Sequence, residues 1–154
     1  MKIVAVLSLL IVLCFCWYQP LYGQEPVASI AVLPVHSAGI DSVYVQTAES
    51  ILRTEIGKLS TMDIISQRRT LEALGGSSCW ETDCAIAVGK SLNASYVAGC
   101  QLSPLGDKVV VAYFLVSVAN NRAVLIDQTT APTIEDLEMV MKRIAQSIVE
   151  HQPT

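Results

Sequence analysis

Histidine is scarce in this 154-residue chain, which contains only His36 and His151. The sequence therefore has no HExxH zinc pair, and it also lacks a G-x-S-x-G nucleophile elbow and a glycine-rich phosphate loop. Basic side chains are few as well, because ten Lys and Arg residues stand against fourteen Asp and Glu residues, a balance that disfavours nucleic-acid binding. These absences argue against the common hydrolase, metalloprotease and nucleotide-binding classes, and we expect no metal or cofactor.

The longest apolar run lies at the N-terminus. Residues 3–17 are almost entirely apolar and follow Lys2, a pattern typical of a secretory signal peptide. A membrane-spanning helix needs about 20 apolar residues, and this run is shorter. We expect cleavage after Gly23, so that residues 1–23 are removed. Lipid attachment is not expected, because neither Cys14 nor Cys16 follows a small residue.

The remaining chain, residues 24–154, has the size of one domain. Its 131 residues are enough to bury a hydrophobic core, and no internal repeat or low-complexity tract divides them. Loss of Lys2 leaves nine basic against fourteen acidic side chains, a net charge of −5. We expect one domain without a transmembrane segment, located outside the cytoplasm.

The first half of this domain alternates between strand and helix patterns. Residues 29–35 form a continuous apolar, β-branched run typical of a buried parallel strand. A helix capped by Asp41 is predicted through residue 59, followed by a strand at 62–66. A short helix at 68–74 should end at Gly75-Gly76.

The second half departs from this alternation. A helix at 83–92 should lead into a strand at 96–102, with Pro104, Gly106 and Asp107 in a turn. Asn120-Asn121 can take the positive φ of a hairpin turn, so strands at 108–118 and 122–130 should pair antiparallel.

The last predicted helix begins at Thr133, with Glu135 and Asp136 in its first turn. Its inner face should consist of apolar residues, namely Leu137, Val140, Met141, Ile144 and Ile148. The predicted fold is a single three-layer α/β domain in the order βαβααβββα. Its mixed five-stranded sheet is parallel in one half and antiparallel in the other.

Two cysteines, Cys79 and Cys84, lie close together in a polar segment. In an oxidising compartment they should form a disulfide that joins the loop to the third helix and contributes about 2 kcal/mol. The alternative is a thiol–disulfide-active pair, because Cys84 would lie in the first turn of a helix, where the dipole lowers a thiol pKa. Four intervening residues, where thiol oxidoreductases commonly have two, favour the structural bridge. Cys100, in an apolar strand, should be a free, buried thiol.

Three residues are candidates for partner binding: Arg68, Arg69 and His36. The Arg68-Arg69 pair can contact an acidic surface, with a solvated basic pair as the alternative. His36 follows the first strand, where open α/β sheets bind ligands, but without a nucleophile or metal partner it is expected to be a solvated loop histidine. Glu81 and Asp83 are explained by the helix dipole, and we assign no metal site and no catalytic residue.

Four segments in order carry a family resemblance: residues 30–34 (IAVLP), 64–68 (IISQR), Cys79 with Cys84-Ala85, and 89–99 (GKSLNASYVAG). Together they resemble a periplasmic group that includes the TolB N-terminal domain and CsgG-like proteins. The resemblance implies a fold similar to anticodon-binding domains. It also implies a bacterial, non-enzymatic module that contacts envelope proteins, among them outer-membrane or secretion components, in envelope assembly, secretion or transport.

Overall fold

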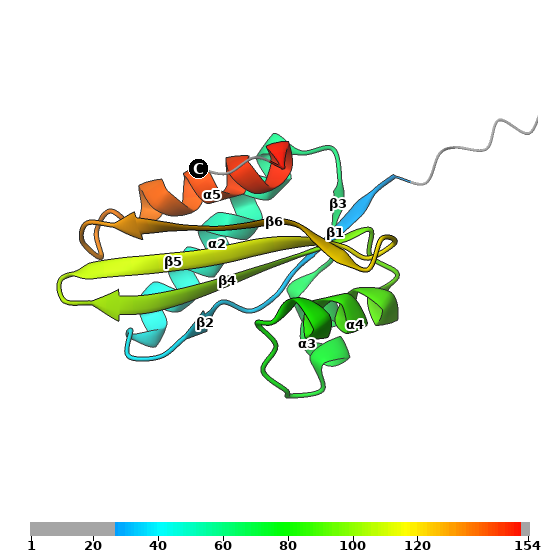
Figure 1. Ribbon diagram of the computed structural model, residues 1–154, viewed down its shortest axis with the longest axis horizontal. Helices are drawn as coiled ribbons and strands as arrows, with labels where there is room; N and C mark the ends of the chain where they lie inside the picture. The colour runs from blue at the N-terminus through cyan, green and yellow to red at the C-terminus, as the bar shows by residue number, and fades with distance from the viewer. Residues whose placement is uncertain (1–26, 152–154) are drawn as a thin grey trace, which may run out of the picture.

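The computed structural model describes residues 27–151, and the predicted signal peptide lies outside these residues (Figure 1). The elements follow one another in chain order as β1 (Ser29–Val32), β2 (His36–Ser37), α2 (Ser42–Leu59), β3 (Asp63–Ile64), α3 (Gln67–Leu74), α4 (Thr82–Leu92), β4 (Tyr96–Leu105), β5 (Lys108–Ser117), β6 (Arg122–Ala131) and α5 (Leu137–Glu150).

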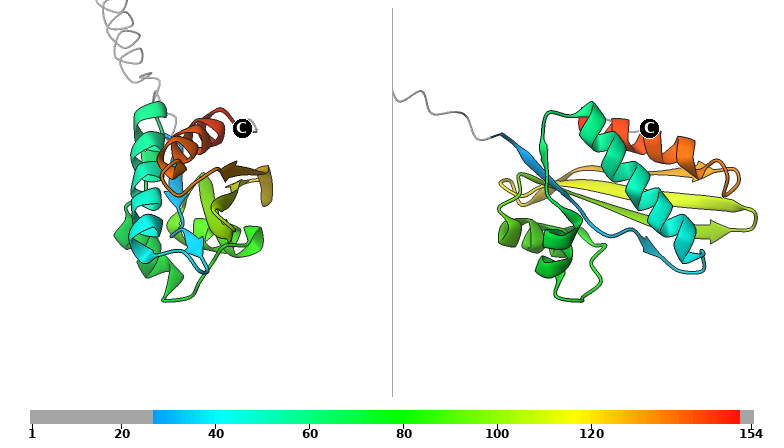
Figure 2. Two further views of the ribbon diagram at one scale, coloured as in Figure 1. Left: turned by 90° about the vertical axis from the view of Figure 1, so that its left-hand side faces the viewer. Right: turned by 180° about the vertical axis from the view of Figure 1, so that it is seen from behind.

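The strands form one mixed sheet in the order β3-β1-β4-β5-β6, with β2 also paired to β4. β1 runs parallel to β3 and β4, whereas β4, β5 and β6 are antiparallel to one another. Helices lie on both sides of this sheet (Figure 2). The predicted α/β architecture, parallel in one half and antiparallel in the other, is therefore confirmed.

The sheet has six strands rather than five. β1 ends at Val32, short of the predicted Val35, and β2, which was not predicted, follows at His36–Ser37. The Leu33 N–H still donates to the Ala98 carbonyl at 2.9 Å. Pro34 has no N–H to donate, which ends the ladder. Pairing resumes only at His36, which lies opposite Gln101 on β4.

One face of the sheet, which we call the closed face, is covered by α2 and α5 (Figures 1 and 2). The inner face of α5 is buried as predicted, and Leu52 and Ile56 of α2 are also fully buried. Together with Val111 and Leu115 of β5 they form the larger of two core clusters.

The opposite face carries α3 and α4, which lie under only one end of the long strands (Figure 1). Here α4 approaches the sheet closely, because a Cβ atom on Gly89 would lie 2.4 Å from Val118 Cγ2 and 2.7 Å from Val97 Cγ2. The second core cluster lies beneath these two helices and includes Ala85, Leu92 and Val97. We call this side the open face.

Local signals place most helix ends correctly. Asp41 caps α2 by accepting the Val43 N–H at 2.8 Å, and Gly75 ends α3 with a φ of 58°. β3 is shorter than the strand predicted at 62–66, because Ser66 is the N-cap of α3 and accepts the Arg69 N–H at 3.5 Å.

Two boundaries in the second half are wrong. β4 continues through Pro104 to Leu105, so Pro104 is a strand residue, and the turn is made by Gly106 and Asp107. α5 begins at Leu137 rather than Thr133, because Thr133 Oγ1 hydrogen-bonds to Asp136 Oδ2 at 3.0 Å in a turn before the helix. The β5–β6 hairpin is confirmed, with Asn121 at a φ of 49°.

Candidate functional site

The predicted disulfide is present between Cys79 and Cys84, whose Cα atoms are 5.8 Å apart. It joins the loop after α3 to the first turn of α4. Cys79 packs into the core beneath this loop and is only 7% exposed. Cys100 is free and buried as predicted, and burial raises the pKa of its thiol to about 12.

Trp80 follows the first cysteine and stacks on His36, with ring centroids 5.9 Å apart and an angle of 18° between the planes. His36 is therefore a half-buried residue of a short strand, and the prediction of a solvated loop histidine is wrong. Asp41, the nearest acid that follows it in sequence, caps α2 instead. Within the described residues, no hydrogen bond joins His36 to a carboxylate.

A groove of about 690 Å³ lies on the open face beside this stacked pair. We call it the Trp80 groove. Its residues come from the start of α4 and from the middle of three strands, and they are Trp80, Glu81, Thr82, Asp83, Cys100, Gln101, Ala112, Tyr113, Phe114, Ile126, Asp127 and Gln128.

The floor and outer side of the Trp80 groove are largely apolar. The Phe114 ring lies across Gly99 on the neighbouring strand, where a Cβ atom would be 2.2 Å from Phe114 Cζ. Only glycine permits this close approach. Ile126 on β6 is 69% exposed, and Trp80 on the opposite wall is 43% exposed. Neither side chain is buried by the fold itself.

The charge of the groove comes from the start of α4. Glu81 and Asp83 are both exposed there. The Asp127 carboxylate accepts a hydrogen bond from the Tyr113 hydroxyl at 2.8 Å, and this hydroxyl also contacts Ser147 Oγ of α5 at 3.0 Å. Asp127 is thus engaged on the closed face. Among residues 27–151, no group of three or more His, Cys, Asp or Glu side chains is arranged to hold a metal ion.

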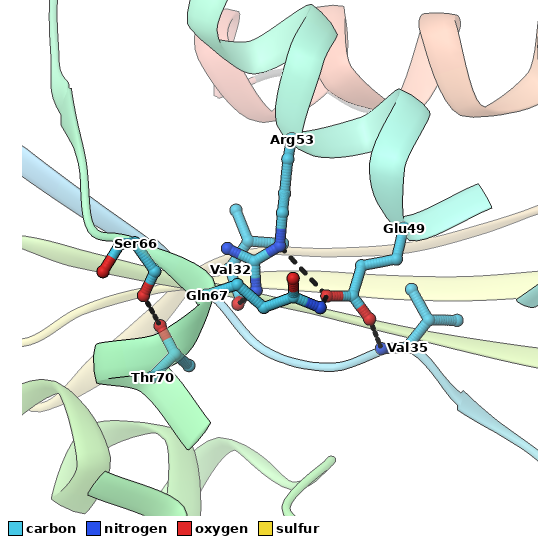
Figure 3. A network of polar contacts seen from close by, with 7 residues as sticks. All are labelled: Val32, Val35, Glu49, Arg53, Ser66, Gln67 and Thr70. Atoms are coloured by element: carbon cyan, nitrogen blue, oxygen red, sulfur yellow. Dashed lines mark hydrogen bonds and ion pairs between the residues drawn. The ribbon is translucent and has the colours of Figure 1, made fainter. Parts of the chain in front are cut away.

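A buried polar network lies beside the break between β1 and β2 (Figure 3). Glu49 of α2 accepts the Val35 N–H at 3.2 Å through one carboxylate oxygen. Its other oxygen accepts hydrogen bonds from Arg53 Nε at 3.0 Å and from Gln67 Nε2 at 2.9 Å. Arg53 Nη2 also donates to the Val32 carbonyl.

This network holds both segments that approach the Trp80 groove. Val35 directly precedes His36, on which Trp80 stacks, and Gln67 is the first residue of α3, which leads into the disulfide loop. The network thus satisfies the Val32 carbonyl and the Val35 N–H, two backbone groups beside the break at Pro34. Glu49 was not among the predicted site residues, although an acid on the inner face of α2, beside Ala48 and Leu52, was a signal for it.

The predicted partner-binding residues are not brought together. His36 lines a separate pocket of about 200 Å³ with Cys79 and Leu74. Arg68 and Arg69 lie in the exposed first turn of α3, outside the lining of the Trp80 groove. The Arg68 Nε atom is 3.8 Å from Glu72 on the same helix. A role for the three residues in partner binding stays a prediction.

The sequence matches no family model and no curated protein. Its fold is similar to that of TolB from Acinetobacter baumannii, with a TM-score of 0.60, 15% identity, and coverage of 82% of this chain and 28% of TolB. It is also similar to the LpoB C-terminal domain from Salmonella enterica, with a TM-score of 0.56, 14% identity, and coverage of 70% and 86%.

A third similar structure is lipoprotein GNA1162 from Neisseria meningitidis, with a TM-score of 0.56 and 13% identity. The similarity covers 79% of this chain and 96% of the lipoprotein. At these identities the similarity establishes a shared fold.

Within residues 27–151, no helix combines the length and the apolar character needed to cross a bilayer.

Proposed function

We propose that this protein is a non-enzymatic interaction module of the bacterial cell envelope. In this proposal it is exported to the periplasm or secreted, its signal peptide is cleaved near Gly23, and it binds envelope proteins during assembly, secretion or transport. The observation that carries the proposal is the Trp80 groove, a largely apolar surface on a half-covered sheet where Trp80 and Ile126 stay substantially exposed. The fold shared with TolB, the LpoB domain and a lipoprotein also supports it.

The position of the disulfide favours a structural role for Cys79 and Cys84 over thiol–disulfide exchange. Exchange requires a thiolate to reach one sulfur of the bridge, and Cys79 is packed into the core while Cys84 is half-buried against the same core cluster. A bridge in this position stabilises the loop that carries Trp80. Such a bridge fits a protein that matures in an oxidising compartment.

Photocrosslinking in cells tests the proposal on the full chain. A photoreactive residue replaces exposed Gln128 in the groove, and a matched one replaces exposed Gln146 on α5. We expect envelope proteins to crosslink to position 128 and not to position 146, with the protein in the periplasmic or secreted fraction. Retention in the cytoplasm, or equal crosslinking from both positions, would contradict the proposal. A variant carrying Arg68→Ala and Arg69→Ala shows whether the α3 pair contributes to capture.

A further inference from the structure

We propose that the Trp80 groove binds a short peptide segment of the partner in which a lysine or arginine stands beside apolar side chains. This inference rests on the proposed function and names the chemistry of the partner at that site. It follows from three properties of the groove: an apolar floor and rim, a negative wall and a size suited to a few residues.

The apolar component is supplied by three elements. Phe114 lies on the floor, Trp80 on the wall formed by the disulfide loop, and Ile126 on the outer strand. Ile126 and Trp80 are substantially exposed in the free protein, so a ligand in contact with both would remove apolar surface from water. Gln101 and Gln128 add amide groups that can hydrogen-bond to a peptide backbone.

The charge of the groove wall determines which charge a ligand should carry. Glu81 and Asp83 contribute two exposed carboxylates, and among the described residues that line the groove none is Lys or Arg. The N-terminus of α4 is worth only about half a positive charge. The carboxylates outweigh it, so the wall attracts a cation. A lysine or arginine beside this wall would also lie near the Trp80 ring, where a cation–π contact adds to the attraction.

The volume of about 690 Å³ limits the ligand to a short segment. Pockets for drug-sized ligands span roughly 300–1,000 Å³. A few residues of a partner chain fit this range, whereas a folded domain could contact only the rim. The groove is thus suited to a cationic, amphipathic peptide segment.

Isothermal titration calorimetry of the exported protein tests this inference with two short peptides. One alternates leucine and lysine, and its twin carries glutamine in place of each lysine. We expect the lysine peptide to bind about fivefold more tightly than its twin, and we expect salt to weaken this preference because the carboxylates are exposed. Equal binding of the two peptides, or no binding of the lysine peptide, would overturn the inference.

Matched variants locate the binding. Glu81→Gln with Asp83→Asn should abolish the preference for lysine, whereas Glu135→Gln with Glu138→Gln removes the same charge elsewhere and should preserve it. Ile126→Ser should weaken both peptides, unlike Val43→Ser at a similarly exposed site. Equal effects of the two charge variants would assign the preference to the overall negative charge and overturn the inference. The proposed function would survive that result if position 128 still crosslinked to envelope proteins.

Discussion

The two faces of the sheet differ in how completely helices cover them. On the closed face, the eighteen residues of α2 and fourteen of α5 extend about 27 Å and 21 Å. On the open face, the eleven residues of α4 extend about 16 Å. The ten-residue strands β4, β5 and β6 extend about 33 Å, so α4 leaves their far half uncovered.

This difference in helix length separates stability from binding. The closed face contains the larger core cluster, which includes the long buried inner face of α5. The open face retains an apolar groove, and a disulfide, rather than a further helix packed over the sheet, holds its wall in place. We infer that substitutions on the closed face and its polar network mainly affect unfolding, whereas substitutions in the groove mainly affect binding.

The largest effect is expected at Glu49, which links the closed-face helix α2 to segments that reach the open face. Glu49→Ala would leave the Arg53 charge and the Val35 N–H without their partner in a mostly buried site. We expect a loss of about 3 kcal/mol in the free energy of unfolding, measured by urea denaturation. Glu138→Ala is the control, because its pair with Lys142 is exposed, and it should leave the midpoint unchanged. Equal shifts for the two variants would show that the faces are not linked through Glu49.

A smaller loss is expected when the disulfide is removed. Cys79→Ala combined with Cys84→Ala opens a short loop, and the chain-entropy model gives about 2 kcal/mol of destabilisation. The closed face does not contain this bridge, so the far-ultraviolet circular dichroism signal of its helices should persist in the absence of denaturant. Loss of most of the helical signal would mean that the loop organises the closed face as well.

His36→Ala should have a still smaller effect, about 1 kcal/mol, because it removes a half-buried ring stacked on Trp80. Trp80 is the only tryptophan in residues 24–154, so its fluorescence reports the loop directly. We expect a shifted emission maximum together with the small change in urea midpoint. An unchanged spectrum would indicate that the stacking does not position the groove wall.

Cys100 reports on the closed face with the smallest effect on stability. Because burial raises the pKa of its thiol to about 12, the thiol stays neutral at pH 8 and should resist a thiol-reactive dye until urea unfolds the chain. The pH dependence of stability follows from ionisation of the Cys100 thiol in the unfolded chain. Burial of the neutral thiol contributes its full share of the folding free energy below the unfolded-state pKa near 9. This share is lost as the pH rises toward 12, because the unfolded chain is stabilised by ionising its thiol. Rapid labelling of the native protein would show that the closed face opens readily.

Several features of the site left signals in the sequence. The disulfide followed from two nearby cysteines in an exported chain, and the buried Cys100 from its apolar strand. Gln101 and Ser103, at alternate positions toward the end of β4, also indicated that one face of this strand meets solvent. The stacking of Trp80 on His36 could not be predicted, because 43 residues separate the two rings and only the tertiary fold brings the disulfide loop to β2.

Local patterns by themselves determined the order of helices and strands apart from β2, the caps at Asp41 and Gly75 and the inner face of α5, because each depends on residues within a few positions of one another. Only the tertiary structure decided that Glu49 would receive the Val35 N–H and Gln67, and that α4 would leave half of one sheet face uncovered. Such features depend on distances between elements far apart in the chain. Periodicity shows that a face is apolar, whereas the packing of whole elements decides what covers it.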